Sequence, residues 1–228
     1  MSGNKNTYLT VALPPASADA LAALAGHLAK AAATIPACPS GKVPSFGAMD
    51  RDVLHMTFFF AGEQLAGLNA DALAAFHAAV AAAATLAGDD ARDDVLVFTG
   101  LRVFPPGKNN LVVAEYAAPS WLTMLQASVE RIAAEHGIIT SGSVRRNTAV
   151  ANVNAMPRWV PHVTLGKIRA TRLAVGGVGE ALVRQGAMMA KVTPAVLRLG
   201  LDGLNVGGFQ PRQRWLDWAM PFAPSGRG

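Results

Sequence analysis

The sequence predicts an α+β fold of two similar lobes, with two antiparallel-type sheets, helices on the outside and a central groove. Three observations predict it: strand-like and helical segments alternate, their order in the first half recurs in the second, and the pattern His-x-Thr lies at corresponding places in both halves. We expect residues 1–228 to form a single bilobal domain. Lobe one is expected at about 7–105 and lobe two at about 108–222, with closing strands able to cross between them.

In the first half, each segment has its own local signal. Tyr8–Leu13 is a β-type run, and Ser17 is a candidate N-cap for a helix that continues to about Ala33. A Pro- and Gly-rich connection follows, and then Val53–Phe60 predicts a strand that carries the first His-x-Thr. The half closes with a helix capped by Asn69 or Asp71 and ending near Leu86, and with a strand over Val95–Val103.

The second half repeats this order. Leu111–Tyr116 predicts a strand, Ser120 is a candidate cap for a helix that stops at Gly137, and a polar, basic loop covers Thr140–Arg158. Trp159–Ile168 predicts the strand with the second His-x-Thr. The last expected elements are a helix at Val178–Met189 and strands at Val196–Leu204 and Arg214–Met220. Because 48 residues separate Thr7 from His55 and 51 separate Leu111 from His162, we expect a duplicated lobe with the two motif strands side by side at a pseudo-twofold axis.

Composition narrows the class of protein. The formal charge of +5 and the pI of about 9.8 favour a polyanionic partner such as RNA or a nucleotide. Cys38 is the single cysteine, which excludes an intrachain disulfide and a multi-cysteine zinc site, and we expect a cytoplasmic protein, with the nucleus as the alternative. No run of about 18 unbroken apolar residues occurs, so no membrane partner is expected. A monomer is expected.

The two His-x-Thr motifs, His55-Met56-Thr57 and His162-Val163-Thr164, carry the chemistry. On a strand, residues i and i+2 share a face, so each motif presents an imidazole and a hydroxyl together while Met56 or Val163 turns into the core. Metal-independent cleavage of a phosphodiester needs a base, an acid and donors to the phosphoryl oxygens. Two histidines and two threonines supply these groups without a metal or a cofactor.

The other histidines, His27, His77 and His136, lie in or at the end of predicted helices, where a structural role is sufficient. The sequence contains no P-loop, no GxSxG, no HExxH and no Asp-rich metal signature. Kinases that use nucleoside triphosphates, serine hydrolases and metallohydrolases therefore lack their characteristic motifs here.

At these residues the chain resembles the two-histidine (2H) phosphoesterase superfamily. His55–Glu63 is similar to the first family motif with its trailing F-x-G-E, and Pro161–Leu165 is similar to the second motif with its preceding proline. Tyr8–Pro14 resembles the opening strand of the family, and Gly100–Pro105 resembles the segment that closes the first lobe. The resemblance implies a bilobal α+β fold over nearly the whole chain.

Two branches of the superfamily resemble the chain: the RNA 2′,3′-cyclic phosphodiesterases, also named 2′-5′ RNA ligases, and the central domain of A-kinase anchoring protein gamma. The first implies hydrolysis of a 2′,3′-cyclic phosphate on an RNA end or a small nucleotide. The second implies a 2′,5′-oligoadenylate phosphodiesterase or a non-catalytic domain that binds AMP or RNA. The sequence leaves these alternatives open.

The resemblance implies that His55 and His162 are the acid and base and that Thr57 and Thr164 hold the phosphate. Four further residues are candidates for substrate binding. Lys167 follows the second motif, but regular alternation places it on the opposite face from His162 unless the strand bends or bulges. Tyr8 either offers its ring to a nucleobase near the groove or is a core residue. Arg145 and Arg146 either hold a longer phosphate backbone or belong to a solvated loop.

Overall fold

The computed structural model describes most of the chain, in ten ranges: 7–11, 13–37, 41–62, 68–88, 96–104, 110–138, 159–169, 175–190, 204–208 and 214–220. Strands and helices alternate along these ranges, as the sequence predicts. The elements are β1 (Thr7–Val11), α1 (Pro15–Ala33), β2 (Ser45–Ala48), the 3-10 helix η1 (Arg51–Val53), β3 (Met56–Gly62), α2 (Ala70–Gly88), β4 (Val97–Phe104), β5 (Leu111–Ala117), α3 (Ser120–Glu135), β6 (His162–Arg169), α5 (Val175–Ala190), β7 (Leu204–Gly208) and β8 (Arg214–Met220).

The eight strands within the described ranges belong to one antiparallel sheet in the order β4-β5-β6-β3-β1-β7-β8, with β2 paired to β6. The two halves of the sheet are joined where β3 meets β6, at the single pair Met56 and Val163. The predicted α+β class is confirmed, and the two expected sheets are continuous with each other because the motif strands hydrogen-bond directly. Met56 and Val163 are both fully buried at this junction.

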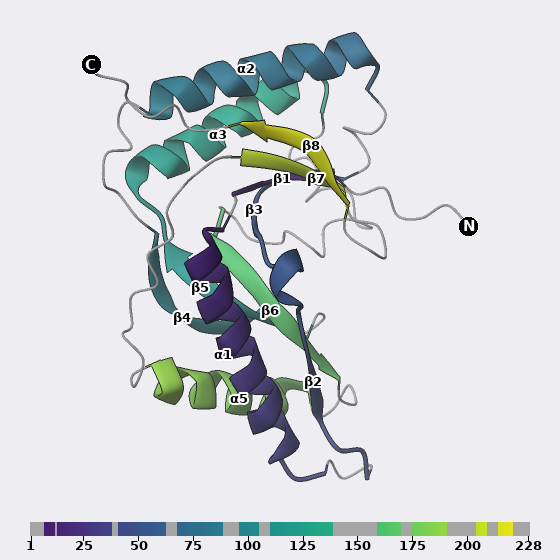
Figure 1. Cartoon of the computed structure of the whole chain (residues 1–228), viewed down its shortest axis with the longest axis vertical. Helices are drawn as coiled ribbons and strands as arrows, with labels where there is room; N and C mark the ends of the chain where they lie inside the picture. Colours follow the sequence, from purple (N-terminus) through teal and green to yellow (C-terminus); the bar gives the residue numbers. More distant parts are fainter. Residues whose placement is uncertain are drawn as a thin grey trace.

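The helices divide into two pairs, each on one half of the sheet (Figure 1). Helices α1 and α5 pack on each other and on β2, β4 and β6, whereas α3 packs on β3 and on α2. Each pair therefore combines one helix from the first half of the sequence with one from the second, and α1 covers β6 of the second half while α5 covers β4 of the first. The spatial lobes interleave the chain and do not follow the expected ranges 7–105 and 108–222.

Several element boundaries differ from the expected ones for local reasons. Helix α1 begins at Pro15, whose fixed φ suits the first helical position, so Ser17 lies inside the helix and is buried. Pro119, and not Ser120, occupies the N-cap of α3. Asn69 does cap α2, since its Oδ1 accepts a hydrogen bond of 2.8 Å from the backbone N–H of Ala72. Gly137 ends α3 with a φ of +71°.

One strand was not predicted by the sequence patterns, and one expected strand can be compared only in part. The short β2 lies in the segment expected to be only a connection. Strand β7 is Leu204–Gly208, and the earlier residues of the expected strand over Val196–Leu204 lie outside the described residues. Strand β8, at Arg214–Met220, has the expected bounds. The expected loop over Thr140–Arg158 and the residue Cys38 lie outside the described residues.

Both motif strands contain a β-bulge at the same place. On β1, Leu9 pairs with Phe59 but the next residue, Thr10, pairs with Thr57, so β3 has one extra residue after Thr57. On β5, Val112 pairs with Gly166 while Val113 pairs with Thr164, so β6 has one extra residue after Thr164. A bulge exchanges the faces of all later residues of the strand. Strict alternation places Phe60 on the buried face, and the bulge moves it to the opposite face.

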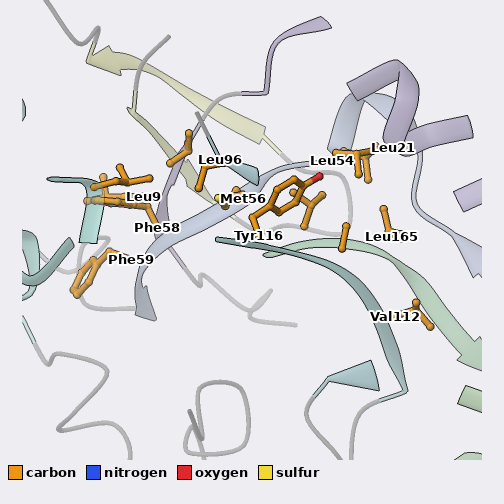
Figure 2. Close-up of a cluster of buried hydrophobic side chains, with 14 of the residues drawn as sticks. Leu9, Leu21, Leu54, Met56, Phe58, Phe59, Leu96, Val112, Tyr116 and Leu165 are labelled. Carbon is orange, nitrogen blue, oxygen red and sulfur yellow. The ribbon is translucent and has the colours of Figure 1, made fainter. Parts of the chain in front are cut away.

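The burial pattern of the two motif strands repeats as a consequence. Along β6, partly exposed His162 and Thr164 flank buried Val163, then Leu165 and Gly166 are both buried, Lys167 is exposed and Ile168 is buried. Residues 55–61 follow the same order of partly exposed and buried positions. Figure 2 shows the shared core beneath these strands, with Phe58 and Leu9 at one side and Leu165 and Val112 at the other. The duplication predicted from spacing therefore extends to the detailed shape of the strands.

Helix α2 is unusually apolar because alanines make up most of it. Among the described residues, its window Ala70–Ala87 is long enough and apolar enough, with a mean hydropathy of 1.5, to cross a membrane by those two measures. The window contains Asp71 and His77, so no unbroken apolar run is present. In the fold, α2 packs against α3 and buries Phe76 and Val80.

Candidate active site

The two His-x-Thr motifs meet at the junction between β3 and β6. Their central residues, Met56 and Val163, are cross-strand partners in an antiparallel pair. Only a twofold relation makes equivalent residues of two repeats pair with each other in this way. The expected placement of the motif strands side by side at a pseudo-twofold axis is therefore confirmed.

The register of this pair brings each histidine to the threonine of the other motif. Stepping one residue along each antiparallel strand from Met56 and Val163 puts Thr57 opposite His162, and His55 opposite Thr164. All four lie on the face that Met56 and Val163 turn away from, and all four are partly exposed. The junction thus gathers two imidazoles and two hydroxyls on one side of the sheet.

Each imidazole is held by a backbone carbonyl two residues before it. His55 Nδ1 lies 2.9 Å from the carbonyl oxygen of Val53, and His162 Nδ1 lies 2.7 Å from that of Val160. Because a carbonyl oxygen can only accept, both Nδ1 atoms carry a hydrogen and donate it. Nε2 is then the nitrogen that gains or loses a proton on each ring, and the tautomer is set by the fold.

The His55 ring has a second support from β1. The ring of Tyr8 stacks on it with 5.0 Å between centroids and an angle of 14° between planes. Tyr8 is only 3% exposed, so its ring lies against His55 and has little surface left for a nucleobase. Of the two roles that the sequence allowed for Tyr8, this placement corresponds to the core residue.

Burial lowers the pKa of both histidines. Desolvation is the largest cause for each, and it is opposed by the hydrogen bond to Val53 or Val160, which favours the charged ring. A charge on His162 lowers the pKa of His55 further. The carboxylate of Glu115 acts in the opposite direction and raises the pKa of His162. The pair therefore resists double protonation, and His162 is the better placed of the two to keep one proton.

Glu115 is a site residue that the sequence reasoning missed. It is the cross-strand partner of His162, and its Oε2 accepts a hydrogen bond of 3.1 Å from Nη1 of Arg102 on β4. The signal was present, because Glu115 is the single charged residue in the apolar run Leu111–Ala117. Its alignment with His162 depends on the bulge in β6, which the sequence does not reveal.

Trp159 is a second such residue, and it connects the approach to β6 with β3. Its indole Nε1 donates a hydrogen bond of 3.1 Å to the backbone oxygen of Thr57, and its ring meets Phe58 edge-on at 5.2 Å between centroids. The backbone N–H of Tyr116 donates to the carbonyl oxygen of Pro161. These contacts fix the segment that precedes His162 on both sides.

The remaining predicted residues separate into one that joins the site face and two that cannot be placed. Lys167 is exposed, and the bulge after Thr164 returns it to the face of His162, which is the condition that the sequence set for it. Arg145 and Arg146 lie outside the described residues. Within the described ranges, no three His, Cys, Asp or Glu side chains gather in a way that could hold a metal ion.

Comparisons with known proteins identify the fold through structure alone. No protein-family model and no curated protein sequence matches the chain. Among solved structures, Usb1 of Kluyveromyces marxianus with uridine monophosphate is 10% identical, with 96% of this chain and 98% of that chain covered and a TM-score of 0.50. LigT of E. coli complexed with NADP+ is 15% identical, with 96% and 99% covered and a TM-score of 0.49.

A third similar structure, described as a phosphoesterase, is 16% identical, with coverage of 95% and 99% and a TM-score of 0.47. The likeness to Usb1 extends over nearly the whole of both chains, and identity this low shows a shared fold. The chain therefore shares the fold of Usb1.

Proposed function

We propose that the protein is a metal-independent phosphodiesterase that hydrolyses 2′,3′-cyclic phosphates on RNA ends or nucleotides. One observation carries the proposal: Met56 and Val163 pair across the junction, and this pairing gathers both histidines and both threonines on one face. A pure binding pocket has no need of two imidazoles held in the same tautomer by matching carbonyl contacts. The uridine monophosphate bound to Usb1 supports a nucleotide-type substrate for this fold.

In this proposal His55 is the base and His162 is the acid. Glu115 favours a proton on His162, and a charged His162 disfavours one on His55, so the singly protonated pair carries its proton on His162. Neutral His55 takes a proton from water through Nε2 as the water oxygen attacks phosphorus. His162 gives its Nε2 proton to the 3′ oxygen as the P–O3′ bond breaks, which leaves a 2′-phosphate.

Thr57 and Thr164 stabilise the phosphoryl oxygens in this reaction. Each hydroxyl lies opposite the histidine of the other motif, so the phosphate would lie between two hydroxyl donors and two imidazoles. The sheet backbone fixes the positions of all four residues, which reduces the reorganisation needed during the reaction.

The test is hydrolysis of 2′,3′-cyclic nucleotides in the presence of EDTA. His55→Ala and His162→Ala should each lower kcat by about 10² to 10⁴, because each removes a proton-transfer group. His27→Ala is the matched control, since His27 is an exposed histidine on α1, and it should leave kcat unchanged. Near-normal turnover in either site variant, or loss of wild-type activity in EDTA, would overturn the mechanism.

A panel of linkages distinguishes the proposed substrate from the alternatives. We expect kcat/KM for 2′,3′-cyclic phosphates to exceed kcat/KM for 2′,5′-linked adenylates. The reverse order would identify the protein as a 2′,5′-phosphodiesterase. Saturable AMP binding without turnover of any linkage would identify a binding domain.

A further inference from the structure

Beyond the bulge, β6 carries two cations on the same face as the two histidines. Ile168 is fully buried under α1 and α5, whereas Lys167 and Arg169 on either side of it are exposed. Their β2 partners, Gly47 for Lys167 and Ser45 for Arg169, are uncharged, as is Leu111, the β5 partner of Lys167. The bulge therefore extends the site face along β6 as a row of His162, Thr164, Lys167 and Arg169.

The side chain of Arg169 bends back toward Lys167. A β-carbon on Gly47 would point to the site face, because Gly47 is the cross-strand partner of Lys167. The position of that missing β-carbon lies 3.6 Å from Nε of Arg169 and 3.8 Å from its Nη2. The guanidinium thus lies over Gly47 of β2, on the face that also carries Lys167, so both cationic residues belong to one patch.

No carboxylate neutralises this patch within the described part of the chain. The ion pairs there are those of Arg51 with Asp19 and Asp52, Arg102 with Glu115, and Arg131 with Glu135. None of these pairs includes Lys167 or Arg169. Two adjacent and exposed cations without a counter-charge attract an anion that carries more than one charge.

The spacing of the row fits the repeating phosphates of a nucleic acid chain. Successive same-face residues of a strand are about 7 Å apart, and the bulge lets Thr164, Lys167 and Arg169 follow one another at about this step. Arg169 therefore begins about 13 Å along β6 from Thr164, which is beyond the reach of a single phosphate held between the histidines. A single strand is typically bound by a basic surface that follows its backbone.

We propose that Lys167 and Arg169 form a subsite for the phosphates of the RNA chain that precedes the cyclic end. The inference rests on the proposed function for its direction, since it places the terminal phosphate between His55 and His162. It adds that the preferred substrate is an oligonucleotide, and that Arg169 and Lys167 produce the preference over a mononucleotide.

The test measures binding and so does not depend on turnover. Fluorescence anisotropy gives the Kd of a labelled tetra-adenylate with a terminal 2′-phosphate and of the labelled mononucleotide, over a series of salt concentrations. For the tetra-adenylate, K167A/R169A should raise Kd roughly tenfold and reduce the dependence of log Kd on log salt by about 1.4, or about 0.7 per lost phosphate contact. The ratio of the two Kd values should fall toward one.

Arg184→Ala is the matched control, because Arg184 is exposed on α5, on the opposite side of the sheet, and its change should leave both Kd values as in the wild type. Arg169→Lys keeps the positive charge and should keep most of the dependence of log Kd on log salt. A Kd ratio unaffected by K167A/R169A would overturn the subsite, even if cyclic phosphates are hydrolysed normally. ATP that competes with the same dependence on Arg169 as the tetra-adenylate would assign the patch to polyphosphates and overturn the chain assignment. Absence of turnover with the expected Kd changes would reject the proposed function and keep the subsite.

Discussion

The two motif strands have the same shape and different chemistry beyond the motif. In β3 and β6 the histidine, the threonine and the bulge occupy equivalent positions, and so do the carbonyls that hold the imidazoles. Five residues after the histidine, however, β3 has Phe60 and β6 has Lys167. The duplicated backbone is kept where both halves contribute to the candidate site, and the residues that flank it differ.

The residues that neighbour the two histidines on the flanking strands also differ. Tyr8 stacks on His55, whereas the strand that flanks His162 brings the carboxylate of Glu115. Burial lowers the pKa of both imidazoles, and only His162 has a neighbouring carboxylate that favours its charged form. Equivalent scaffolds can therefore give two histidines opposite protonation states, as an acid and a base require.

The largest expected effect that tests the equivalence of the two motif strands is the loss of kcat when a threonine is replaced. Thr57→Ala and Thr164→Ala should each lower kcat by about 10² to 10³, because each removes a hydroxyl donor to the phosphoryl oxygens. Thr57→Ser and Thr164→Ser keep the hydroxyl and should keep most of the activity. Steady-state kinetics on a 2′,3′-cyclic nucleotide measures both. A large loss in one half only would mean that the symmetric part of the site is not used symmetrically.

The next effect concerns stability at the bulge. Gly166→Ala should destabilise the fold by about 1–3 kcal/mol, because a β-carbon there would overlap the ring of Phe46 and lie 2.5 Å from the carbonyl oxygen of Gly47. The equivalent position of β3 holds Phe59, which is buried in the core. Thermal denaturation measures the change as a lower Tm, at about 2 to 4 °C per kcal/mol.

Gly26→Ala is the control for that prediction, since nothing lies within 4 Å of its added β-carbon in α1. It should raise stability by about 0.5–1 kcal/mol, because alanine favours a helix over glycine. If Gly166→Ala were as stable as the wild type, β2 would not be packed against β6 as described.

A smaller effect is expected at the stacked ring. Tyr8→Leu should lower kcat by about twofold to tenfold, because a stacked aromatic pair contributes about 0.5–1.5 kcal/mol and its loss frees the His55 ring to turn. Tyr8→Phe keeps the ring and should keep kcat. Equal losses in the two variants would assign the effect to the hydroxyl. A change in KM with constant kcat would indicate instead that Tyr8 contacts the nucleobase of the substrate.

The four motif residues of the candidate site could be predicted from the sequence, and their surroundings could not. His55, Thr57, His162 and Thr164 follow from a repeated pattern and a strand period of two, which local sequence specifies. The face of Lys167 and the partner of His162 depend on where a bulge occurs, and the bulge is fixed by pairing with β1 and β5. The interleaving of the lobes also arises from long-range packing, since α1 packs on β6, about 130 residues further along the chain.

The finest test of the comparison is the pH dependence of kcat/KM in Glu115→Gln. The wild-type profile should be bell-shaped, with its alkaline limb below the ordinary histidine range because burial lowers the pKa of both rings. Glu115 raises the pKa of His162, so its neutralisation should lower that pKa further, and the alkaline limb should move to lower pH. Glu135→Gln removes an equally ion-paired carboxylate on α3 and should leave the profile unchanged. An alkaline limb that stays in place or moves to higher pH would reverse the assignment of His162 as the acid, because the group that loses its proton there would not be the one beside Glu115.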